Sequence, residues 1–237
     1  MNTAIILAGG VGSRVGGTIP KQFAEIKGAP VIAYTMSAFE KNSNIEKIVV
    51  VCVQGWEEKV KAIAEKYRIT KFYGAVKGGR NSMESIKNGV FSLKDMDDDD
   101  LVIIHDSVRP VLEQHVISDC VFKARMYGNG CAAIPLQETM ARTKDGISST
   151  EDIDRSEIMR IQTPQAYRYR DIMSIYDEAE KKGITESVYT NTLALQLGRK
   201  IYFSEGSSFN VKITTPQDLK LMEMLLTLNM METPKSQ

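Results

Sequence analysis

A glycine-rich stretch near the start of the chain carries two cations, Arg14 and Lys21. It directly follows a short apolar run at residues 4–8. Five glycines occupy it, namely Gly9, Gly10, Gly12, Gly16 and Gly17. Glycines let backbone N–H groups approach a bulky anion closely, and guanidinium and ammonium groups neutralise its charge. The stretch therefore predicts a loop that binds a ligand with several phosphate charges.

The glycine spacing excludes two common nucleotide motifs. No Gly-Lys-Ser or Gly-Lys-Thr sequence closes the stretch, so it is not a P-loop. Gly10 and Gly12 lack a glycine three residues further on, so the dinucleotide-binding fingerprint is also absent. A glycine-rich turn without a ligand is the alternative, but the two nearby cations favour a phosphate site.

A carboxylate and a guanidinium follow a second apolar run, at residues 101–105. Asp106 supplies hard oxygen ligands suited to Mg²⁺, and Arg109 can hold an anion. The alternative is a structural ion pair within the loop. His105 is expected to be a packed, hydrogen-bonded side chain and not a catalytic base.

A second glycine turn lies at residues 77–82 and leads into a helical pattern. Gly79 and Ser85 belong to this turn and the helix start, and Arg80 is placed to contact a phosphate or a base edge. A solvated loop arginine is the alternative. Turns at the carboxyl ends of parallel strands line the ligand crevice of an open sheet, so both glycine turns are expected there.

Alternating apolar runs and helical patterns predict the α/β class, with a doubly wound, mostly parallel Rossmann-like sheet in a single domain over residues 1–230. The predicted strands are 4–8, 45–53, 71–73, 101–105, 131–136, 201–203 and 210–214. The predicted helices are 31–40, 56–67, 83–93, 114–127, 169–182, one that follows a cap at 190–192, and 216–228. Residues 162–165 are expected to form a compact polar turn.

Composition narrows the class of partner and the compartment. Lys and Arg together number 30, as do Asp and Glu together, so the formal net charge is zero. Bulk electrostatics therefore gives no support for nucleic acid or a membrane surface as a partner. No signal-peptide pattern or membrane-spanning apolar run is expected. Cys52, Cys120 and Cys131 lie in apolar segments without ligand spacing, which is typical of reduced core thiols in a cytoplasmic protein.

The polar stretch at residues 137–156 predicts a protruding β-hairpin arm, because an Asp145-Gly146 turn lies at its centre. Two isolated strands are marginal in water. The arm is therefore expected to pack on a second copy of the chain, giving a homodimer.

Four sequence blocks in this order resemble the cytidylyltransferases that make CDP-polyols, a family that includes the 2-C-methyl-D-erythritol 4-phosphate and ribitol 5-phosphate enzymes. The resemblance covers residues 3–226. The blocks are Leu7 to Arg14 with Pro20-Lys21-Gln22, His105 to Pro110, Gln162 to Gln165, and Asn210 to Pro216. It implies that CMP is transferred from CTP to a polyol phosphate, with Mg²⁺ as cofactor and pyrophosphate as the second product.

The same resemblance implies a role for each matching position. The residues that would act on the reacting phosphates are Arg14, Lys21, Arg155 and Lys212. Those that would hold CTP are Leu7, Ala8, Gly9, Gly10, Gly12, Gly79, Arg80, Ser85 and Ser107. Those that would seat the polyol phosphate are Arg109, Thr139 and Thr163, and Asp106 would orient Mg²⁺. Because the family's arm crosses to the partner subunit, Thr139 and Arg155 are expected to act in the neighbour's site.

Departures from the family pattern bear on the acceptor. Ser107 stands where methylerythritol enzymes usually have alanine, and Asn191 replaces a common aspartate before a helix of the site. With the approach at residues 206–210, these favour D-ribitol 5-phosphate as the acceptor and CDP-ribitol as the product. 2-C-methyl-D-erythritol 4-phosphate is the alternative acceptor. An alternative of another class, a non-catalytic nucleotide-binding regulator, rests on Asn191 alone.

Overall fold

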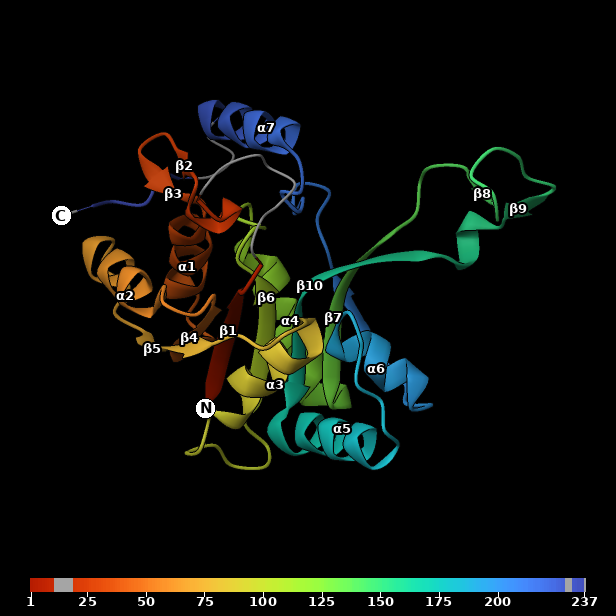
Figure 1. Ribbon diagram of the computed structural model, residues 1–237, viewed down its shortest axis with the longest axis horizontal. Helices are drawn as coiled ribbons and strands as arrows, with labels where there is room; N and C mark the ends of the chain where they lie inside the picture. Colours follow the sequence, from red (N-terminus) through yellow and green to blue (C-terminus); the bar gives the residue numbers. More distant parts are fainter. Residues whose placement is uncertain (11–18, 229–231, 237) are drawn as a thin grey trace.

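A mixed sheet of seven strands forms the centre of the molecule (Figure 1). The computed structural model describes residues 1–10, 19–228 and 232–236. The strand order is β11-β7-β10-β6-β1-β4-β5. Their bounds are β1 (Asn2–Ala8), β4 (Lys47–Cys52), β5 (Phe72–Lys77), β6 (Leu101–Asp106), β7 (Asn129–Pro135), β10 (Met159–Arg168) and β11 (Phe203–Glu205). β10 runs antiparallel to both its neighbours and the other pairs are parallel, which confirms the predicted mostly parallel sheet.

Helices cover both faces of the sheet, because successive side chains of each central strand point to opposite faces. Ile6 of β1 belongs to one core cluster and Ile5 to the other. The helices on the Ile6 side are α1 (Val31–Lys41), α2 (Glu57–Lys66), α4 (Gln114–Tyr127) and α7 (Pro216–Thr227). Those on the Ile5 side are α3 (Ser82–Phe91), α5 (Tyr169–Lys181) and α6 (Thr190–Gln196). None of the helices in the described ranges has the length and hydropathy needed to cross a bilayer.

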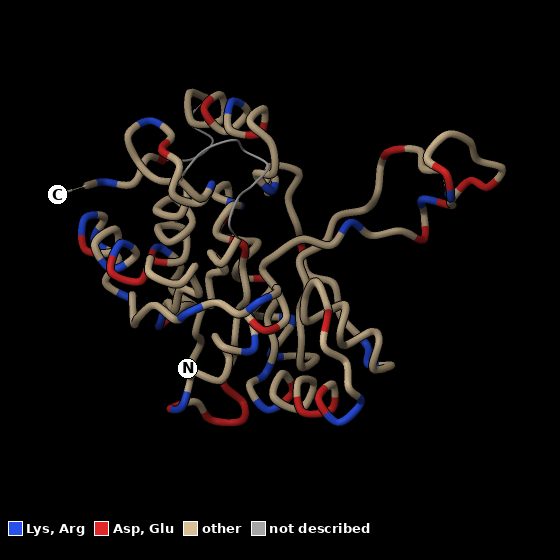
Figure 2. The backbone as a smooth tube through the Cα atoms, viewed as in Figure 1, with Lys and Arg blue, Asp and Glu red and all other residues tan. Residues whose placement is uncertain are grey.

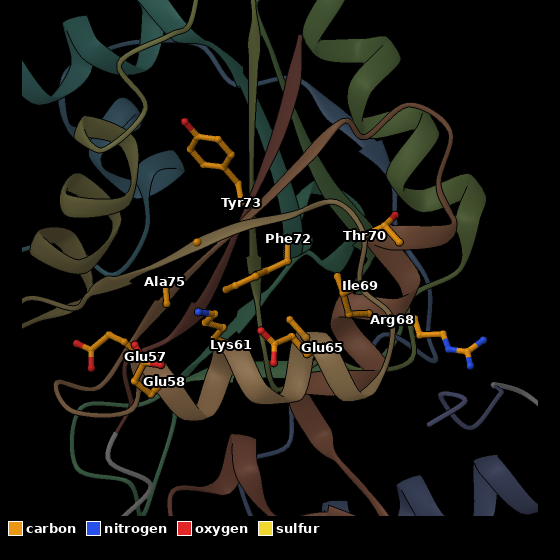
Figure 3. Close-up of a pocket in the computed structure, with 12 residues that line it drawn as sticks. Glu57, Glu58, Lys61, Glu65, Arg68, Ile69, Thr70, Phe72, Tyr73 and Ala75 are labelled. Atoms are coloured by element: carbon orange, nitrogen blue, oxygen red, sulfur yellow. The ribbon is translucent and has the colours of Figure 1, made fainter. Parts of the chain in front are cut away.

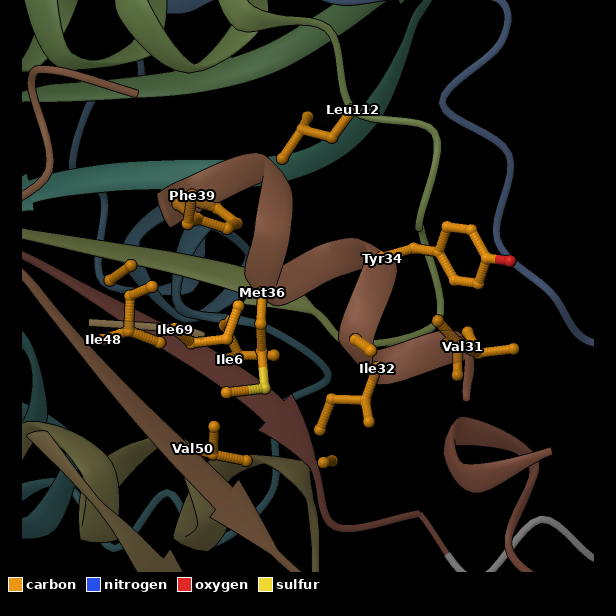
Figure 4. Close-up of a cluster of buried hydrophobic side chains, with 14 of the residues drawn as sticks. Ile6, Val31, Ile32, Tyr34, Met36, Phe39, Ile48, Val50, Ile69 and Leu112 are labelled. Atoms are coloured by element: carbon orange, nitrogen blue, oxygen red, sulfur yellow. The ribbon is translucent and has the colours of Figure 1, made fainter. Parts of the chain in front are cut away.

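Helix α1 shows how the pattern of apolar residues builds this core. Ile32, Met36 and Phe39 recur at helical spacing and are fully buried. Figure 4 shows this face of α1 turned towards the strands that carry Ile6 and Val50. Fully burying side chains of this size stabilises the fold by about 1.5–3 kcal/mol each.

The strand register sets the position of the loops. Leu7 is paired with Asp106, and Ala8 with Cys52, which is in turn paired with Lys77. Strands β1, β4, β5 and β6 therefore end level with one another at one edge of the sheet. The loops that follow them are brought together at that edge, as expected for an open parallel sheet.

The predicted arm is confirmed as a hairpin that projects from the sheet (Figure 1). Its strands are β8 (Met140–Arg142) and β9 (Glu151–Ile153), followed by the short 3₁₀-helix η2 (Arg155–Glu157). Residues 137–152 are all exposed in the single chain. Figure 2 shows both cations and anions on the arm and over the remaining backbone, with a run of anions at residues 97–100 before β6.

Two strand predictions near the C-terminal part of the chain are wrong. Residues 210–214 form no strand, because their backbone groups bond to loops instead of a sheet neighbour: Ile213 N donates to Val108 O at 2.9 Å and Asn210 O accepts from Arg109 Nη1 at 2.8 Å. The strand predicted at 201–203 begins later, at Phe203, and pairs with Cys131 of β7. Strand β5 is longer than the predicted 71–73.

The turn predicted at residues 162–165 and the helix cap predicted at residues 190–192 also differ from the structure. Residues 162–165 lie inside β10, where the pairing with β7 shifts register and the Thr163–Pro164 peptide is cis. Pro164 lacks the N–H that a regular ladder needs, so the polar residues interrupt the strand without ending it. Helix α6 begins after Tyr189, and no side chain caps it. The small hairpin of β2 (Glu25–Ile26) and β3 (Ala29–Pro30) encloses a turn that contains Gly28, and 3₁₀-helix η1 (Lys21–Phe23) precedes it.

Gly130 tests how closely α4 packs on β7. A Cβ at this position would lie 2.6 Å from the Cys120 carbonyl oxygen and 2.9 Å from Lys123 Cβ. We expect Gly130→Ala to lower the free energy of unfolding by roughly 2–3 kcal/mol, measured by urea denaturation, because α4 or β7 must shift. Gly74→Ala is the matched control, since nothing lies within 4 Å of its Cβ position in strand β5. Equal stability of the two variants would contradict this account of the packing.

Candidate active site

A cavity of about 360 Å³ opens at the carboxyl ends of β1, β5 and β6, where the sequence predicts the ligand crevice. Its wall includes the predicted residues Leu7, Gly9, Gly10, Lys21, Gly79, Arg80, Ser85, Asp106, Ser107 and Lys212. Asn81 and Ser82, within the predicted turn between Gly79 and Ser85, also belong to it. The wall further includes residues to which the sequence assigns no role, namely Gln22, Val108, Val188 and Tyr189. The size suits a small-molecule ligand, and we call this space the first cavity.

The two glycine turns meet on one side of the first cavity. A Cβ on Gly9 would lie 3.5 Å from Ser85 Oγ, and one on Gly78 would lie 3.3 Å from the same atom and 3.2 Å from the Cys52 carbonyl oxygen. Ser85 Oγ accepts a hydrogen bond from Gly79 N at 3.0 Å and donates one to Asn81 O at 2.8 Å. The absence of side chains thus lets the turn after β5 lie directly against the loop after β1.

Gln22 holds the start of the glycine-rich loop that follows β1. Its Nε2 atom donates to Ala8 O at 2.6 Å and to Gly10 O at 2.9 Å, and the residue is 1% exposed. The Pro20-Lys21-Gln22 sequence gave the signal for this residue, although only Lys21 was assigned a role. Ala8 itself is buried and lies outside the cavity wall.

Lys21 reaches across the first cavity from η1. Its Nζ atom donates to Ile213 O at 2.9 Å, which ties it to the segment that carries Lys212. Two ammonium groups predicted from separate sequence blocks therefore line the same space. Arg14 and Gly12, predicted for this loop, lie outside the described residues.

Asp106 is the centre of the charged part of the site. It is 5% exposed, and its Oδ2 accepts from Arg109 Nε at 3.0 Å and lies 3.2 Å from Lys212 Nζ. The Tyr189 hydroxyl donates to Oδ1 at 3.0 Å and to Oδ2 at 2.8 Å, and it accepts from Lys212 Nζ at 2.6 Å. Thr163 lies behind this group, since its Oγ1 accepts from Asp106 N at 3.2 Å.

These contacts account for the ionisation of the group. Burial opposes the charge on Asp106, but Lys212, Arg109 and the Tyr189 hydroxyl outweigh it, so the pKa of Asp106 lies below its usual value. Burial and the Asp106 charge both raise the pKa of Tyr189, so its phenol remains a donor. The group is therefore one carboxylate, two cations and a neutral hydroxyl.

His105 is a packed side chain, as predicted. It is 0% exposed, its ring meets Phe39 edge-on at 5.3 Å, and its Nε2 lies 3.1 Å from the Arg109 carbonyl oxygen. A carbonyl accepts only, so Nε2 carries the proton. Burial lowers the pKa of His105 to about 4, which keeps the ring neutral.

A second cavity of about 190 Å³ shares Lys212 with the first. Arg109, Arg160 and Lys212 give it three cationic groups, and Gln162 and Asn210 add buried amides. The Oδ1 atom of Asn210 has no hydrogen-bond donor among the described residues. The second cavity thus offers positive charge, which suits a phosphate. Sequence reasoning missed Arg160, which lies outside all four motif blocks.

Several predicted residues lie away from these cavities or are engaged elsewhere. Arg80 lines the first cavity, but its guanidinium pairs with Glu84 and its side chain is 90% exposed. Thr139 and Arg155 are on the exposed arm, where Arg155 Nη1 donates to Gln137 O at 2.6 Å. Neither arm residue lines the first or the second cavity.

Asn191 does not reach the site. Its Oδ1 accepts from Gln165 Nε2 at 2.9 Å, and the residue is 5% exposed within α6. Tyr189, two residues earlier, supplies the side chain that does reach Asp106. The replacement at Asn191 therefore gives the hypothesis of a non-catalytic regulator no support.

Another cavity, about 500 Å³ in size, lies between α2 and the edge strand β5 (Figure 3). Its polar lining consists of surface side chains of mixed charge, such as Glu57, Lys61 and Arg68. It contains neither a glycine turn nor a buried charged group, so its size alone does not make it the active site.

The donor set for Mg²⁺ in this region is small. Asp106 is the single carboxylate among the residues that line the first and second cavities, and no cluster of three acidic, His or Cys ligands occurs in the described part of the chain. Asp106 Oδ1 receives one of the hydrogen bonds given above, whereas Oδ2 receives the others. One carboxylate oxygen fits a Mg²⁺ ion that takes its other ligands from phosphates and water.

Comparison with known proteins gives consistent matches over almost the whole chain. Residues 2–228 match the family model described as IspD, 2-C-methyl-D-erythritol 4-phosphate cytidylyltransferase. A ribitol-5-phosphate cytidylyltransferase of Lacticaseibacillus paracasei is 40% identical over 95% of this chain and 98% of its own length. A 2-C-methyl-D-erythritol 4-phosphate cytidylyltransferase of Clostridium acetobutylicum is 35% identical over 97% and 99%. The solved structure of 4-diphosphocytidyl-2C-methyl-D-erythritol synthase from Anaerococcus prevotii shares the fold, with a TM-score of 0.81 at 24% identity and coverage of 95% and 96%.

The neutral, buried His105 makes stability depend on pH. The pKa of His105 falls from 6.5 to about 4 on folding, because the folded state holds the ring neutral. The contribution of the neutral ring to the free energy of unfolding is therefore fully present above pH 6.5 and is lost as the pH drops towards 4. We expect the free energy of unfolding to decrease by roughly 2–3 kcal/mol more between pH 7 and 4 in the wild type than in His105→Gln, measured by urea denaturation. His115→Gln is the control, since His115 is 48% exposed, and it should follow the wild-type curve. Parallel curves for all three proteins would refute the prediction.

Proposed function

Since this chain belongs to the IspD family of cytidylyltransferases, we propose that it transfers CMP from CTP to D-ribitol 5-phosphate, which yields CDP-ribitol and pyrophosphate. The chain is a nucleotidyltransferase that acts on CTP and a polyol phosphate. The choice of ribitol rests on one observation, the 40% identity over nearly full length to a protein named for this acceptor.

The second candidate acceptor is 2-C-methyl-D-erythritol 4-phosphate. It is supported by the description of the family model and by relatives of 33–35% identity that carry this name. Ribitol enzymes of Streptococcus agalactiae fall at 34%, within the same range. The difference therefore comes from the Lacticaseibacillus paracasei relative at 40% identity.

The two cavities divide the substrates in this proposal. CTP occupies the first cavity, with its phosphates near the glycine loop, Lys21 and Lys212. The polyol phosphate occupies the second cavity, near Arg109 and Arg160. Because Lys212 lines both spaces, it lies where the attacking phosphate and the α-phosphate of CTP must meet.

The chemistry needs charge neutralisation and no general base. A phosphate monoester has a second pKa near ~6, so the acceptor is already an anionic nucleophile at neutral pH. Its oxygen attacks the α-phosphorus of CTP, and the bond to the β-phosphate oxygen breaks as pyrophosphate leaves. Lys21, Lys212 and Arg109 reduce the repulsion between the two anions and stabilise the charge on the leaving group.

Mg²⁺ belongs to the proposal as the ion that neutralises the triphosphate. Asp106 would hold it through Oδ1, the carboxylate oxygen with the fewer hydrogen bonds. The chain contributes the position of this oxygen, which Arg109 and Tyr189 fix from two sides.

A panel of acceptors tests the proposed substrate. With CTP and Mg²⁺, we expect pyrophosphate release with D-ribitol 5-phosphate to exceed release with 2-C-methyl-D-erythritol 4-phosphate by at least about 10-fold in kcat/KM, a difference of about 1.4 kcal/mol in transition-state binding. Free ribitol, which lacks the phosphate, is the control and should give no release. A preference for the methylerythritol phosphate would overturn the ribitol assignment and leave the cytidylyltransferase activity intact.

The arm supports the proposal that the enzyme is a homodimer through residues 137–156. Met140 is 42% exposed and Ile147 is 90% exposed on a hairpin of two short strands, which has little stability of its own. A loop excursion of this length is usually functional and packed on something. A second chain would cover the arm, and Thr139 and Arg155 would then act in the neighbour's second cavity.

Subunit mixing tests the crossed arm. We expect Lys21→Ala and Arg155→Ala each to reduce kcat by about 10²- to 10³-fold, since each removes a cation from the transition state. Heterodimers of the two variants contain one site with both residues intact and one site with neither. Activity measured by pyrophosphate release should then rise towards half the wild-type value per heterodimer.

Homodimers of each variant, kept unmixed, are the control for this experiment. Native mass spectrometry of differently tagged subunits shows whether exchange has occurred. Exchanged heterodimers that stay as inactive as their parents would place Arg155 in the site of its own chain.

A further inference from the structure

Tyr189 joins three segments of the chain at the wall between the two cavities. It precedes α6, while Asp106 ends β6 and Lys212 follows β11 along the chain. Its hydroxyl is bonded to both side chains, at 2.8 Å from Asp106 Oδ2 and 2.6 Å from Lys212 Nζ. The three residues all line the first cavity.

The direction of the hydrogen bonds gives Tyr189 a defined role. The single hydroxyl proton is donated to the carboxylate, and the hydroxyl oxygen accepts from the ammonium group. A phenylalanine would keep the ring and lose both hydrogen bonds.

The hydroxyl gives Lys212 a partner in addition to Asp106. Lys212 Nζ lies 3.2 Å from Asp106 Oδ2, the oxygen to which Arg109 also donates at 3.0 Å. The Tyr189 oxygen offers Lys212 a second partner on the side of the first cavity. Two fixed partners define the direction of a flexible lysine side chain better than one does.

We propose that Tyr189 is a positioning residue for cytidylyl transfer, which holds Lys212 and Asp106 at the junction of the two cavities where the reacting phosphates meet. The inference rests on the CTP-dependent activity and does not depend on which polyol phosphate is the acceptor. Tyr189 acts through Lys212, so its contribution belongs to the transition state and not to the affinity for CTP.

Kinetics of Tyr189→Phe test this role, with whichever acceptor the wild type turns over. We expect kcat to fall about 10-fold, the effect of losing hydrogen bonds to charged groups, while KM for CTP changes by less than about 3-fold. The matched control is Tyr176→Phe. Tyr176 of α5 is buried, and its hydroxyl lies 3.1 Å from Thr190 Oγ1 at the start of α6, away from both cavities. This control should lose stability in urea denaturation and keep kcat within about 2-fold of the wild type.

A double-mutant cycle separates positioning from a general structural effect. If Tyr189 acts through Lys212, then Tyr189→Phe causes no further loss of kcat in a Lys212→Met background. Independent, multiplying losses would overturn the proposal, and so would an unchanged kcat in Tyr189→Phe or an equal loss in Tyr176→Phe. A preference of the wild type for another acceptor would contradict the ribitol assignment, and the comparison of the variants would still decide the role of Tyr189.

Discussion

The buried carboxylate of Asp106 is the constraint on which the site depends. A buried charge is costly unless it is paired and hydrogen-bonded. Asp106 meets this requirement with Arg109, Lys212 and Tyr189, which come from three different loops. The arrangement of these three loops therefore depends on the ionisation of Asp106. Loss of that charge would leave two cations at the edge of the sheet without their common partner.

The sheet makes this convergence possible. Strands β1 and β6 are neighbours in register, so Asp106 and the glycine loop start from the same level. The other cation, Lys212, lies on a segment that follows β11 along the chain. This segment returns to the sheet edge, where Ile213 N donates to Val108 O. That segment was expected to be a strand. It bonds to loops instead, and its Lys212 lines both cavities.

The sequence predicted the α/β class, the sheet edge and most of the cavity wall, because these depend on local patterns. Apolar runs of strand length and glycine turns after them are visible without the fold. Tyr189 and Arg160 could not be found in this way. Each lies outside the motif blocks, and only the tertiary fold brings it to Asp106 or to the second cavity. Asn191 shows the opposite case. The sequence pattern places it at the site, two residues from Tyr189, but the Asn191 side chain bonds to Gln165 instead.

The pairing around Asp106 also bears on how the site receives its substrates. Asp106 compensates part of the charge of Arg109 and Lys212 and so holds the two cations together. One carboxylate against two cations leaves a net positive charge at the junction of the cavities. Cations oriented in this way would need little reorganisation to bind a phosphate. A site built from cations alone would attract phosphate more strongly, but the mutual repulsion of the cations would oppose their close approach. The carboxylate thus trades some affinity for a fixed arrangement of the two cations.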